Sequence, residues 1–340
     1  MSIDLDIASV ESWLSENMAG FKGPLAARKI PGGQSNPTFW LTAGSGEYVL
    51  RRKPPGKLLK SAHAVDREFR VQRALRGTDV PVAEMLVLCD DDSVTGSMFY
   101  VMQAVQARNL TDPRLPGMDK AERRAIMAEM GRVLAAIHDV DLQATGLTDY
   151  GPEGNYYERQ TSRWAKQYAA SKIDEIPKME ALGDWLMANI PPDDGQRTLV
   201  HGDFRIDNML FANEAPECVA MLDWELSTTG HPYADLAALI MQWQMPPGAE
   251  GRGLAGVDRA ALGLPSDAEF IADYCQRRGL APIENFGFYL AFSFFRMGAI
   301  LQGVMRRAVD GNASDPERGK KLGAYVPMFA DSGLKAAGQG

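Results

Sequence analysis

The strongest constraint on the fold is a change in the sequence pattern near residue 105. Before this point, short runs rich in β-branched and aromatic residues alternate with turn signals, whereas after it apolar residues recur mainly at helical spacing. A chain of 340 residues is long enough for about two domains. We therefore expect an α+β, bilobal protein. A small β-rich N-terminal lobe (residues 1–105) would be joined through residues 103–108 to a larger, mainly helical lobe (residues 106–340).

The N-terminal part predicts a short first helix and then a small sheet with one helix packed on it. Ala43-Gly44-Ser45-Gly46 is a four-residue hairpin signal between two β-rich runs. Asp6 or Ser9 is placed to cap a first helix. The predicted strands are residues 38–42, 47–51, 85–89 and 98–105, with a turn at 90–93 and a helix over 65–75.

The C-terminal part predicts helices interrupted by three short strands. Asp119 with Glu122, and Ser266 with Glu269, form capping-box patterns at the start of two helices. The first helix continues to His138. The predicted strands are residues 198–200, 208–211 and 218–222, and further helices are expected over residues 235–243, 266–279 and 286–305.

The apolar stretch from Phe286 to Met305 approaches the length of a membrane span. It carries Arg296 near its centre, and a central arginine costs about 2.5–3.5 kcal/mol on membrane-insertion scales. We therefore expect a buried helix here and no membrane partner. The first thirty residues are acidic, without a basic start or an apolar core, so they are not expected to be a signal peptide.

Charge and cysteine content narrow the range of partners and compartments. The formal net charge is 36 − 44 = −8, which disfavours binding to nucleic acid or to an anionic membrane. Residues 241–340 carry ten acidic and eleven basic side chains, so the deficit lies in the first part of the chain. Cys89, Cys218 and Cys275 are far apart and form no C-x-x-C pair. We therefore expect a reducing, cytoplasmic environment.

One constellation carries a chemical prediction. Asp203 follows His201-Gly202, Asn208 lies five residues later, and Asp223 ends an apolar strand twenty residues after Asp203. Phosphoryl transfer from a nucleotide needs a carboxylate that orients the attacking hydroxyl, and hard oxygen ligands that hold Mg²⁺ against the phosphates. This spacing can bring the three side chains to one site.

Neighbouring residues have less specific interpretations. The position of His201 favours a role as a hydrogen-bonded anchor of a loop. The position of Asp235 favours a role as an acid that stabilises a helix N-terminus or a loop. Glu225 fits equally a structural acid or a partner of a metal ligand. A metallohydrolase built on His201, Asp203 and His231 is a weak alternative, because the histidines lack H-E-x-x-H spacing.

The H-G-D-x-x-x-x-N run and the following D-W-E resemble the signature of the aminoglycoside phosphotransferase/choline kinase family, which is related to protein kinases. Within that family the chain resembles most the kinase-like domain of the animal acyl-CoA dehydrogenases ten and eleven and their stand-alone bacterial relatives. The resemblance covers nearly the whole chain. It is supported by the segments Tyr48-Val49-Leu50-Arg51-Arg52-Lys53-Pro54-Pro55-Gly56, Asp66-Arg67-Glu68-Phe69, Phe99-Tyr100-Val101-Met102, Thr161-Ser162-Arg163-Trp164 and Leu222-Asp223-Trp224-Glu225-Leu226-Ser227-Thr228.

The resemblance implies a protein-kinase-like fold that uses ATP and Mg²⁺. It implies that Asp203 is the catalytic base and that Asn208 and Asp223 are the magnesium ligands. Arg51 would stand where kinases place the strand lysine that holds the α- and β-phosphates, and it would pair with Glu68.

The resemblance also implies two further nucleotide contacts. A loop over the phosphates would consist of Gly32, Gly33, Gln34, Ser35 and Asn36. Gln103 to Val105 would offer backbone hydrogen bonds to adenine.

Three features depart from protein kinases. Arg51 replaces lysine, and the two side chains grip phosphate with different geometry. The phosphate loop lacks the G-x-G-x-x-G pattern, although two adjacent glycines followed by small polar residues can still bring backbone N–H groups to a phosphate. The A-P-E segment is absent from the sequence, which argues against a protein substrate.

The acceptor is predicted to be a small molecule with a hydroxyl group. The resemblance implies a hydroxyacyl-CoA, such as a 4-hydroxyacyl-CoA, and functional coupling to an acyl-CoA dehydrogenase-like enzyme. An aminoglycoside is the second candidate, but a polycation wants a carboxylate-rich pocket. Arg296, Arg306 and Arg307 in the balanced C-terminal segment suit an anion better. A nucleotide-binding regulatory module without turnover is the third candidate.

Overall fold

A computed structural model describes residues 5–31, 36–54, 64–248, 252–313 and 315–339. Within it the chain forms two compact units, and both are discontinuous in sequence. Unit 1 consists of Met1–Thr111, Val140–Leu147 and Arg205–Ser227. Unit 2 consists of Asp112–Asp139, Thr148–Phe204 and Thr228–Gly340. The division into functional lobes at residues 105 and 106 stays a prediction.

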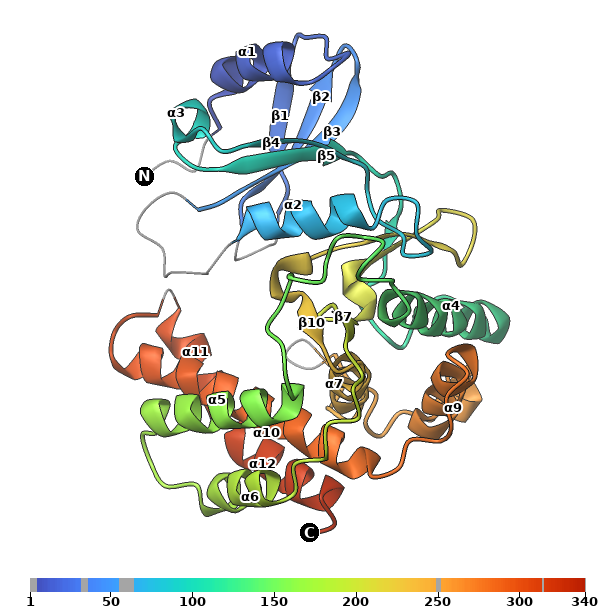
Figure 1. The fold of residues 1–340 in the computed structure, drawn as a ribbon, viewed down its shortest axis with the longest axis vertical. Helices are drawn as coiled ribbons and strands as arrows, with labels where there is room; N and C mark the ends of the chain where they lie inside the picture. Colours follow the sequence, from blue (N-terminus) through green and yellow to red (C-terminus); the bar gives the residue numbers. More distant parts are fainter. Residues whose placement is uncertain (1–4, 32–35, 55–63, 249–251, 314, 340) are drawn as a thin grey trace. The chain divides into compact units, whose positions relative to one another are not determined.

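The N-terminal sheet of unit 1 is antiparallel throughout. Its strands are β1 (Ala26–Lys29), β2 (Thr38–Ala43), β3 (Gly46–Arg52), β4 (Met85–Cys89) and β5 (Phe99–Gln103), in the order β1-β2-β3-β5-β4 (Figure 1). The predicted hairpin is confirmed, because Ala43 pairs with Gly46 and leaves a two-residue turn between β2 and β3. β1 was not predicted. Its sequence, Ala-Ala-Arg-Lys, lacks the β-branched and aromatic residues typical of strands.

Two helices cover opposite faces of this sheet. α1 (Ile7–Asn17), capped by Asp6, packs its apolar side against Leu50 and Val101. α2 (Val65–Ala74) packs against Tyr100 on the other face. Because successive strand residues point to opposite faces, Arg51, next to Leu50 on β3, faces the side that carries α2.

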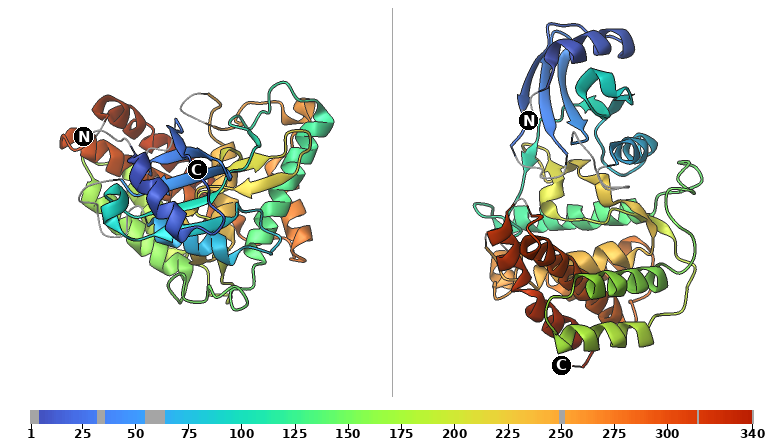
Figure 2. Two further views of the ribbon diagram at one scale, coloured as in Figure 1. Left: turned by 90° about the horizontal axis from the view of Figure 1, so that it is seen from above. Right: turned by 90° about the vertical axis from the view of Figure 1, so that its left-hand side faces the viewer.

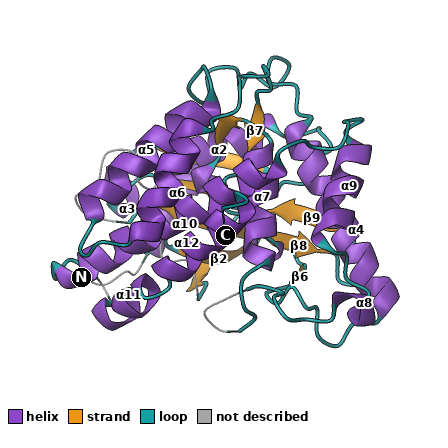
Figure 3. Cartoon of the chain, turned by 90° about the horizontal axis from the view of Figure 1, so that it is seen from below, coloured by secondary structure: helices purple, strands orange, loops and turns teal. Residues whose placement is uncertain are grey.

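A second, three-stranded sheet completes unit 1. It has the order β6-β8-β9, with β6 (Arg108–Asn109), β8 (Met209–Phe211) and β9 (Cys218–Met221) (Figure 3). The 3₁₀ turns η1 (Ile206–Asn208) and η2 (Trp224–Leu226) lie directly before β8 and shortly after β9. The short helix α3 (Asp92–Thr95) forms where the sequence analysis placed a turn, because Asp91 caps it and Gly96 ends it in the left-handed conformation.

Unit 2 is mainly helical. Its helices are α4 (Lys120–His138), α5 (Tyr156–Ser171), α6 (Pro177–Ala188), α7 (Tyr233–Trp243), α8 (Arg259–Leu262), α9 (Asp267–Arg277), α10 (Phe286–Val309), α11 (Pro316–Gly323) and α12 (Val326–Ala336). Its strands β7 (Thr198–Val200) and β10 (Thr228–Gly230) pair antiparallel. The fold is the protein-kinase-like fold that the sequence analysis expected, with an antiparallel N-terminal sheet and a mainly helical C-terminal part.

α10 is the central helix of unit 2. It packs against α5, α6, α7, α11 and α12 (Figure 2, right). Among the described residues it is the one helix with the length and apolarity of a membrane span, and 67% of its most apolar window is buried inside the fold. The prediction of a buried helix over Phe286–Met305 is therefore confirmed, with the helix continuing to Val309.

The helix α9 begins with a capping box, and its contribution to stability can be measured. The Ser266 hydroxyl accepts from the Glu269 backbone N–H at 3.2 Å, and the Glu269 carboxylate accepts from the Ser266 N–H at 2.7 Å. We expect Ser266→Ala to lower the free energy of unfolding of unit 2 by about 1 kcal/mol, measured by urea titration. Ser266→Asp keeps a cap acceptor and is the control. Equal stability of the alanine variant and wild type would contradict the capping role.

Candidate functional site

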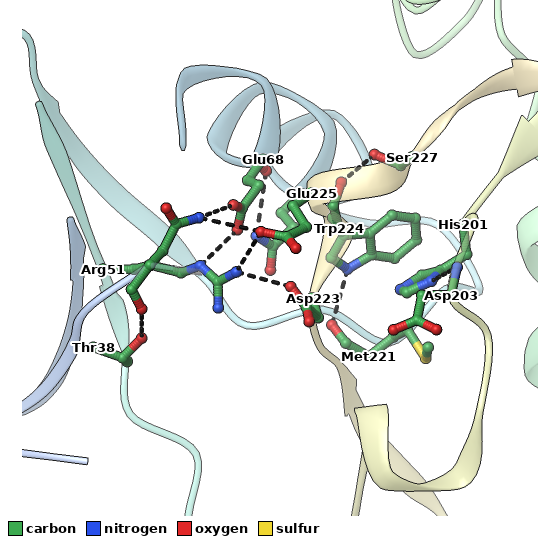
Figure 4. A network of polar contacts seen from close by, with 12 residues as sticks. Thr38, Arg51, Glu68, His201, Asp203, Met221, Asp223, Trp224, Glu225 and Ser227 are labelled. Atoms are coloured by element: carbon green, nitrogen blue, oxygen red, sulfur yellow. Dashed lines mark hydrogen bonds and ion pairs between the residues drawn. The ribbon is translucent and has the colours of Figure 1, made fainter. Parts of the chain in front are cut away.

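Arg51 is the centre of a charged cluster in unit 1 (Figure 4). Its Nε lies 2.9 Å from Glu68 Oε2 on α2, and its Nη2 lies 2.8 Å from Asp223 Oδ1 and 3.5 Å from Glu225 Oε2. The predicted Arg51–Glu68 ion pair is therefore present, and one guanidinium is shared among three carboxylates. Burial works to lower the pKa of Arg51, but the carboxylates outweigh it and raise that pKa.

The buried acid of the cluster has two hydrogen-bond donors in addition to its ion pair with Arg51. Glu68, with a side chain 1% exposed, accepts from Asn36 Nδ2 at 3.0 Å and from the Tyr100 hydroxyl at 3.1 Å. Asn36 Nδ2 also lies 3.4 Å from Glu225 Oε2. Burial raises the pKa of Glu68 to about 7. Arg51 opposes this shift, and the nearby Asp223 and Glu225 carboxylates add to it.

The charge of this cluster suits a divalent cation. One guanidinium faces Glu68, Asp223 and Glu225, so the formal charge with all groups ionised is −2. Asp223, with a side chain 30% exposed, is the most accessible of these acids. Carboxylate and amide oxygens are the donors that Mg²⁺ prefers, so Asp223 and the Asn208 amide fit this metal.

Backbone geometry brings Asn208 and Asp223 together within unit 1. The Leu222 N–H donates to the Asn208 carbonyl at 2.7 Å, beside the β8–β9 pairing. Asp223 itself adopts a left-handed conformation, with φ 63° and ψ 60°, which costs a non-glycine residue about 1–2 kcal/mol. The fully buried Trp224, whose Nε1 donates to the Met221 carbonyl at 2.9 Å (Figure 4), anchors this turn.

Both predicted metal ligands line a cavity of about 490 Å³ in unit 1. Its lining contains both apolar and polar side chains. The apolar lining includes Trp40, Val49, Ala83, Tyr100, Met102, Leu210 and Leu222, and the polar lining includes Arg51, Asp207, Asn208 and Asp223. This volume lies in the range of small-molecule sites, and an apolar slot with convergent polar groups is their usual form.

The predicted adenine-binding segment also lines this cavity, through Gln103 and Val105. The Gln103 N–H donates to Glu84 O at 2.9 Å, and the Ala104 N–H donates to Glu47 O at 3.1 Å. Within the ranges that the structure describes, the Val105 N–H has no such partner. Among the backbone N–H groups of this segment, it is therefore the one with capacity for a ligand.

Of the predicted phosphate loop, the structure describes Asn36. Gly32, Gly33, Gln34 and Ser35 lie outside the described residues. Asn36 is described, and its side chain, 1% exposed, is committed to Glu68 and Glu225. Any phosphate contact of Asn36 would therefore involve its backbone.

Asp203 lies in unit 2, in the loop that follows β7, and the boundary between the units falls between Phe204 and Arg205. Its backbone N–H donates to His201 Nδ1 at 3.2 Å (Figure 4). His201 is fully buried, so it acts as the loop anchor that the sequence analysis expected. The convergence of Asp203 with Asn208 and Asp223 stays a prediction.

The side chain of Asp235 on α7 binds the backbone of this loop. Its carboxylate accepts from the His201 N–H at 2.7 Å and from the Gly202 N–H at 2.8 Å, and it lies 3.3 Å from His138 Nε2. Burial works to raise the pKa of Asp235, but the bonds from His138 and Gly202 outweigh it and lower that pKa. Burial lowers the pKa of His138. A neutral histidine therefore lies beside an ionised aspartate. The interpretation of Asp235 as a loop brace is confirmed.

The contacts of the His231 imidazole ring do not support the metallohydrolase alternative. His231 Nε2 lies 3.3 Å from Asp194 Oδ2, and its Nδ1 accepts from the Tyr233 N–H at 3.2 Å. Both ring nitrogens of His231 therefore have protein partners. Among the residues that were placed, no group of three or more His, Cys, Asp or Glu side chains has the geometry to hold a metal ion.

Sequence reasoning missed two residues of the unit 1 site. Tyr100 supplies a hydroxyl to Glu68 and lines the cavity. The available signal was its place in the strand, because the side chain of Tyr100 points to the sheet face opposite to that of Phe99 and Val101. Asp207 lines the cavity and pairs with Arg205 at 3.3 Å. On the sequence alone, Arg205 and Asp207 fit equally two substrate-facing groups or a surface pair.

Comparison with known proteins gives consistent sequence matches. The model of a family described as "Phosphotransferase enzyme family" matches residues 26–281. The chain is 46% identical over 293 residues to acyl-CoA dehydrogenase family member 10 of Mus musculus, covering 86% of this chain and 27% of that protein. It is 41% identical over 339 residues to family member 11 of Homo sapiens, covering 97% and 43%. The chain thus spans less than half the length of these curated relatives.

Solved structures of phosphotransferase-like proteins are similar to this chain. A Ralstonia eutropha protein assigned as a candidate aminoglycoside phosphotransferase is 47% identical, with a TM-score of 0.91 and coverage of 99% of both chains. The aminoglycoside phosphotransferase APH(4)-Ia, solved as a thermostable mutant in ternary complex with AMP-PNP and hygromycin B, has a TM-score of 0.63 at 20% identity, covering 96% of this chain and 98% of that one. The second likeness shows a shared fold.

The raised pKa of Glu68 predicts a pH dependence of stability. Its folded value of about 7 exceeds the ordinary 4.5, so the folded state holds a proton that the unfolded state releases. The stabilisation from this group is complete below pH 4.5 and is lost as the pH rises through 7. Glu68→Gln cannot titrate. We therefore expect the free energy of unfolding of wild type, minus that of Glu68→Gln, to fall steadily across this window.

Urea titrations at several pH values between 4.5 and 8 measure this difference. Glu214→Gln, which removes an exposed carboxyl of the same unit, is the matched control. A difference between wild type and Glu68→Gln that stays constant with pH would contradict the shift.

Proposed function

Because the chain belongs to the phosphotransferase enzyme family, we propose that it transfers the γ-phosphoryl group of ATP to a hydroxyl group of a small molecule, with Mg²⁺. The observation that carries the proposal is the cavity of unit 1. There Arg51, Asn208 and Asp223 line a cavity of about 490 Å³ together with a set of apolar side chains. A nucleotide has the same division into a flat apolar base and a charged phosphate chain.

The nucleotide would lie along this cavity. The adenine ring would fill the apolar slot and accept a hydrogen bond from the Val105 N–H, which is free of backbone partners in the described ranges. Arg51 would bind the phosphates. The ion pair between its Nε and Glu68 at 2.9 Å restrains the guanidinium, so its phosphate contacts need little reordering of the side chain.

Asn208 and Asp223 would hold Mg²⁺, which neutralises charge on the phosphates when bound. Asp223 now pairs with Arg51 at 2.8 Å. In the nucleotide complex, a phosphate would replace Asp223 as the partner of Arg51 and the metal would replace Arg51 as the partner of Asp223. Each ion would then keep an opposite charge beside it.

Asp203 would act as the catalytic base. The acceptor hydroxyl attacks the γ-phosphorus, the bond from that phosphorus to the β–γ bridging oxygen breaks, and ADP leaves. The hydroxyl proton passes to the Asp203 carboxylate. The Asp235 brace on the His201 and Gly202 N–H groups would hold the Asp203 loop in position.

For the acceptor we favour a hydroxyacyl-CoA, such as a 4-hydroxyacyl-CoA, in a cytoplasmic catabolic reaction. The support is the match to acyl-CoA dehydrogenase family members 10 and 11, which extend well beyond the matched region. An acyl-CoA dehydrogenase-like enzyme would then eliminate the phosphate. An aminoglycoside acceptor is the second candidate, favoured by the assignment of the Ralstonia eutropha protein. The balanced charge of residues 241–340 argues against a site for a polycation.

A panel of acceptors tests this proposal. We expect phosphate transfer from ATP to hydroxyacyl-CoA compounds, detected by mass spectrometry, and no transfer to aminoglycosides or choline. Asp203→Asn should lower kcat by on the order of 10² or more, the scale of a positioned base. A near-normal kcat would refute the role of Asp203. Binding of ATP and Mg²⁺ without transfer to any acceptor would favour a regulatory nucleotide-binding module.

Asp223→Asn tests the metal ligand. We expect this variant to lose the dependence of ATP affinity on Mg²⁺, because a neutral amide binds the cation far more weakly than a carboxylate. Calorimetric titration of ATP with and without Mg²⁺ measures the effect. Glu214→Gln, which removes an exposed acid of unit 1, is the control. Unchanged Mg²⁺ dependence in Asp223→Asn would argue against its role.

A further inference from the structure

A second cationic group in unit 2 lies beside the loop that carries Asp203. Arg296 belongs to the buried helix α10, and its Nη2 lies 3.5 Å from the Gly202 carbonyl oxygen. Gly202 directly precedes Asp203. Adding covalent bond lengths from that oxygen to the Asp203 carboxylate places the guanidinium at most about 12 Å from it. Arg296 is therefore within reach of the same acceptor molecule.

Arg296 and Arg163 flank one aromatic ring. The Cζ atoms of Arg296 and of Arg163 each lie 5.7 Å from the ring centroid of Trp164. Arg163 and Trp164 belong to α5, which packs against α10 (Figure 3). Arg163 is exposed, and Trp164 and Arg296 are partly exposed, so all three are accessible to a ligand.

Neither arginine has a counter-ion among the residues described. Within those ranges, no carboxylate lies within 4.0 Å of the guanidinium of Arg296 or Arg163. Arg306 on the same helix differs, because it pairs with Asp310 at 2.9 Å. In a chain with net charge −8, two arginines without an acidic partner near the catalytic loop leave positive charge available to a ligand. A cation on a largely buried helix needs such a partner to offset its desolvation.

We propose that Arg296, supported by Trp164 and Arg163, binds an acyl oxygen of the acceptor and so selects hydroxyacyl compounds. This inference rests on the proposed function. The acyl oxygen of a hydroxyacyl group with its hydroxyl a few carbons away lies close enough to that hydroxyl to contact Arg296 while the hydroxyl contacts Asp203. The carbonyl of a 4-hydroxyacyl thioester, or the carboxylate of the free hydroxy acid, meets this condition. A polycationic acceptor does not, because it would meet two unpaired positive charges.

The test uses three acceptors of equal chain length with the full chain. They are a 4-hydroxyacyl-CoA, the free 4-hydroxy acid and a secondary alkanol without a carbonyl. We expect Arg296→Gln to raise KM for the preferred acyl acceptor at least about tenfold, the scale of a lost charge-assisted hydrogen bond. KM for ATP and the rate with the alkanol should change less than about twofold, and Arg296→Lys should recover part of the loss. Preference for the thioester or for the free acid in wild type identifies the source of the acyl oxygen.

Two controls separate the possible failures. Arg306→Gln removes an arginine from an exposed pair on the same helix and should leave every KM unchanged. Thermal unfolding of each variant shows whether α10 remains folded, and calorimetric binding of the acyl-CoA without ATP gives a readout independent of turnover. Unchanged KM and acyl-CoA affinity in Arg296→Gln would overturn the inference and leave the proposed function standing. Transfer to aminoglycosides or alkanols but not to acyl acceptors would also overturn it, whereas no transfer to any acceptor would overturn the proposed function itself.

Discussion

The site of unit 1 depends on one guanidinium that is shared among three carboxylates. Arg51 on β3 contacts Glu68 on α2 and both Asp223 and Glu225 at the η2 turn. A buried carboxylate without a partner is costly, and so is a buried arginine, so these groups fix one another. The contacts join the N-terminal sheet, α2 and the segment after β9 within one compact unit. Because the acids outnumber the arginine, the cluster retains the negative charge that a divalent cation would neutralise.

The second organised element is the loop before Asp203 in unit 2. Here the Asp235 carboxylate accepts hydrogen bonds from the N–H groups of His201 and Gly202, and the neutral His138 contacts that carboxylate. A carboxylate that accepts two backbone N–H bonds and a histidine bond is held in one orientation. The loop therefore has little freedom to adapt, as expected of a segment that presents a reactive side chain.

Part of this structure was readable from local sequence signals. The hairpin around Gly44 and the capping box at Ser266 were predicted because turn and cap chemistry acts over three or four residues. β1 and α3 were missed. β1 has a polar sequence that forms a strand only because β2 offers a pairing edge, and α3 is a single turn whose aspartates also suit a loop.

For the site, the residue types and the family were predictable from the sequence alone. The pattern of Asp203, Asn208 and Asp223, with Arg51 and Glu68 upstream, predicted a phosphotransferase, and the ion pair between Arg51 and Glu68 was found as expected. Only the tertiary structure decided that Asp223 and Glu225 share this guanidinium, that Tyr100 and Asn36 satisfy Glu68, and that Arg296 lies against the Gly202 carbonyl. These contacts join residues 32 to 174 positions apart. The physical reason is that such pairs are set by which faces of strands and helices pack together, a property that no local pattern of residues records.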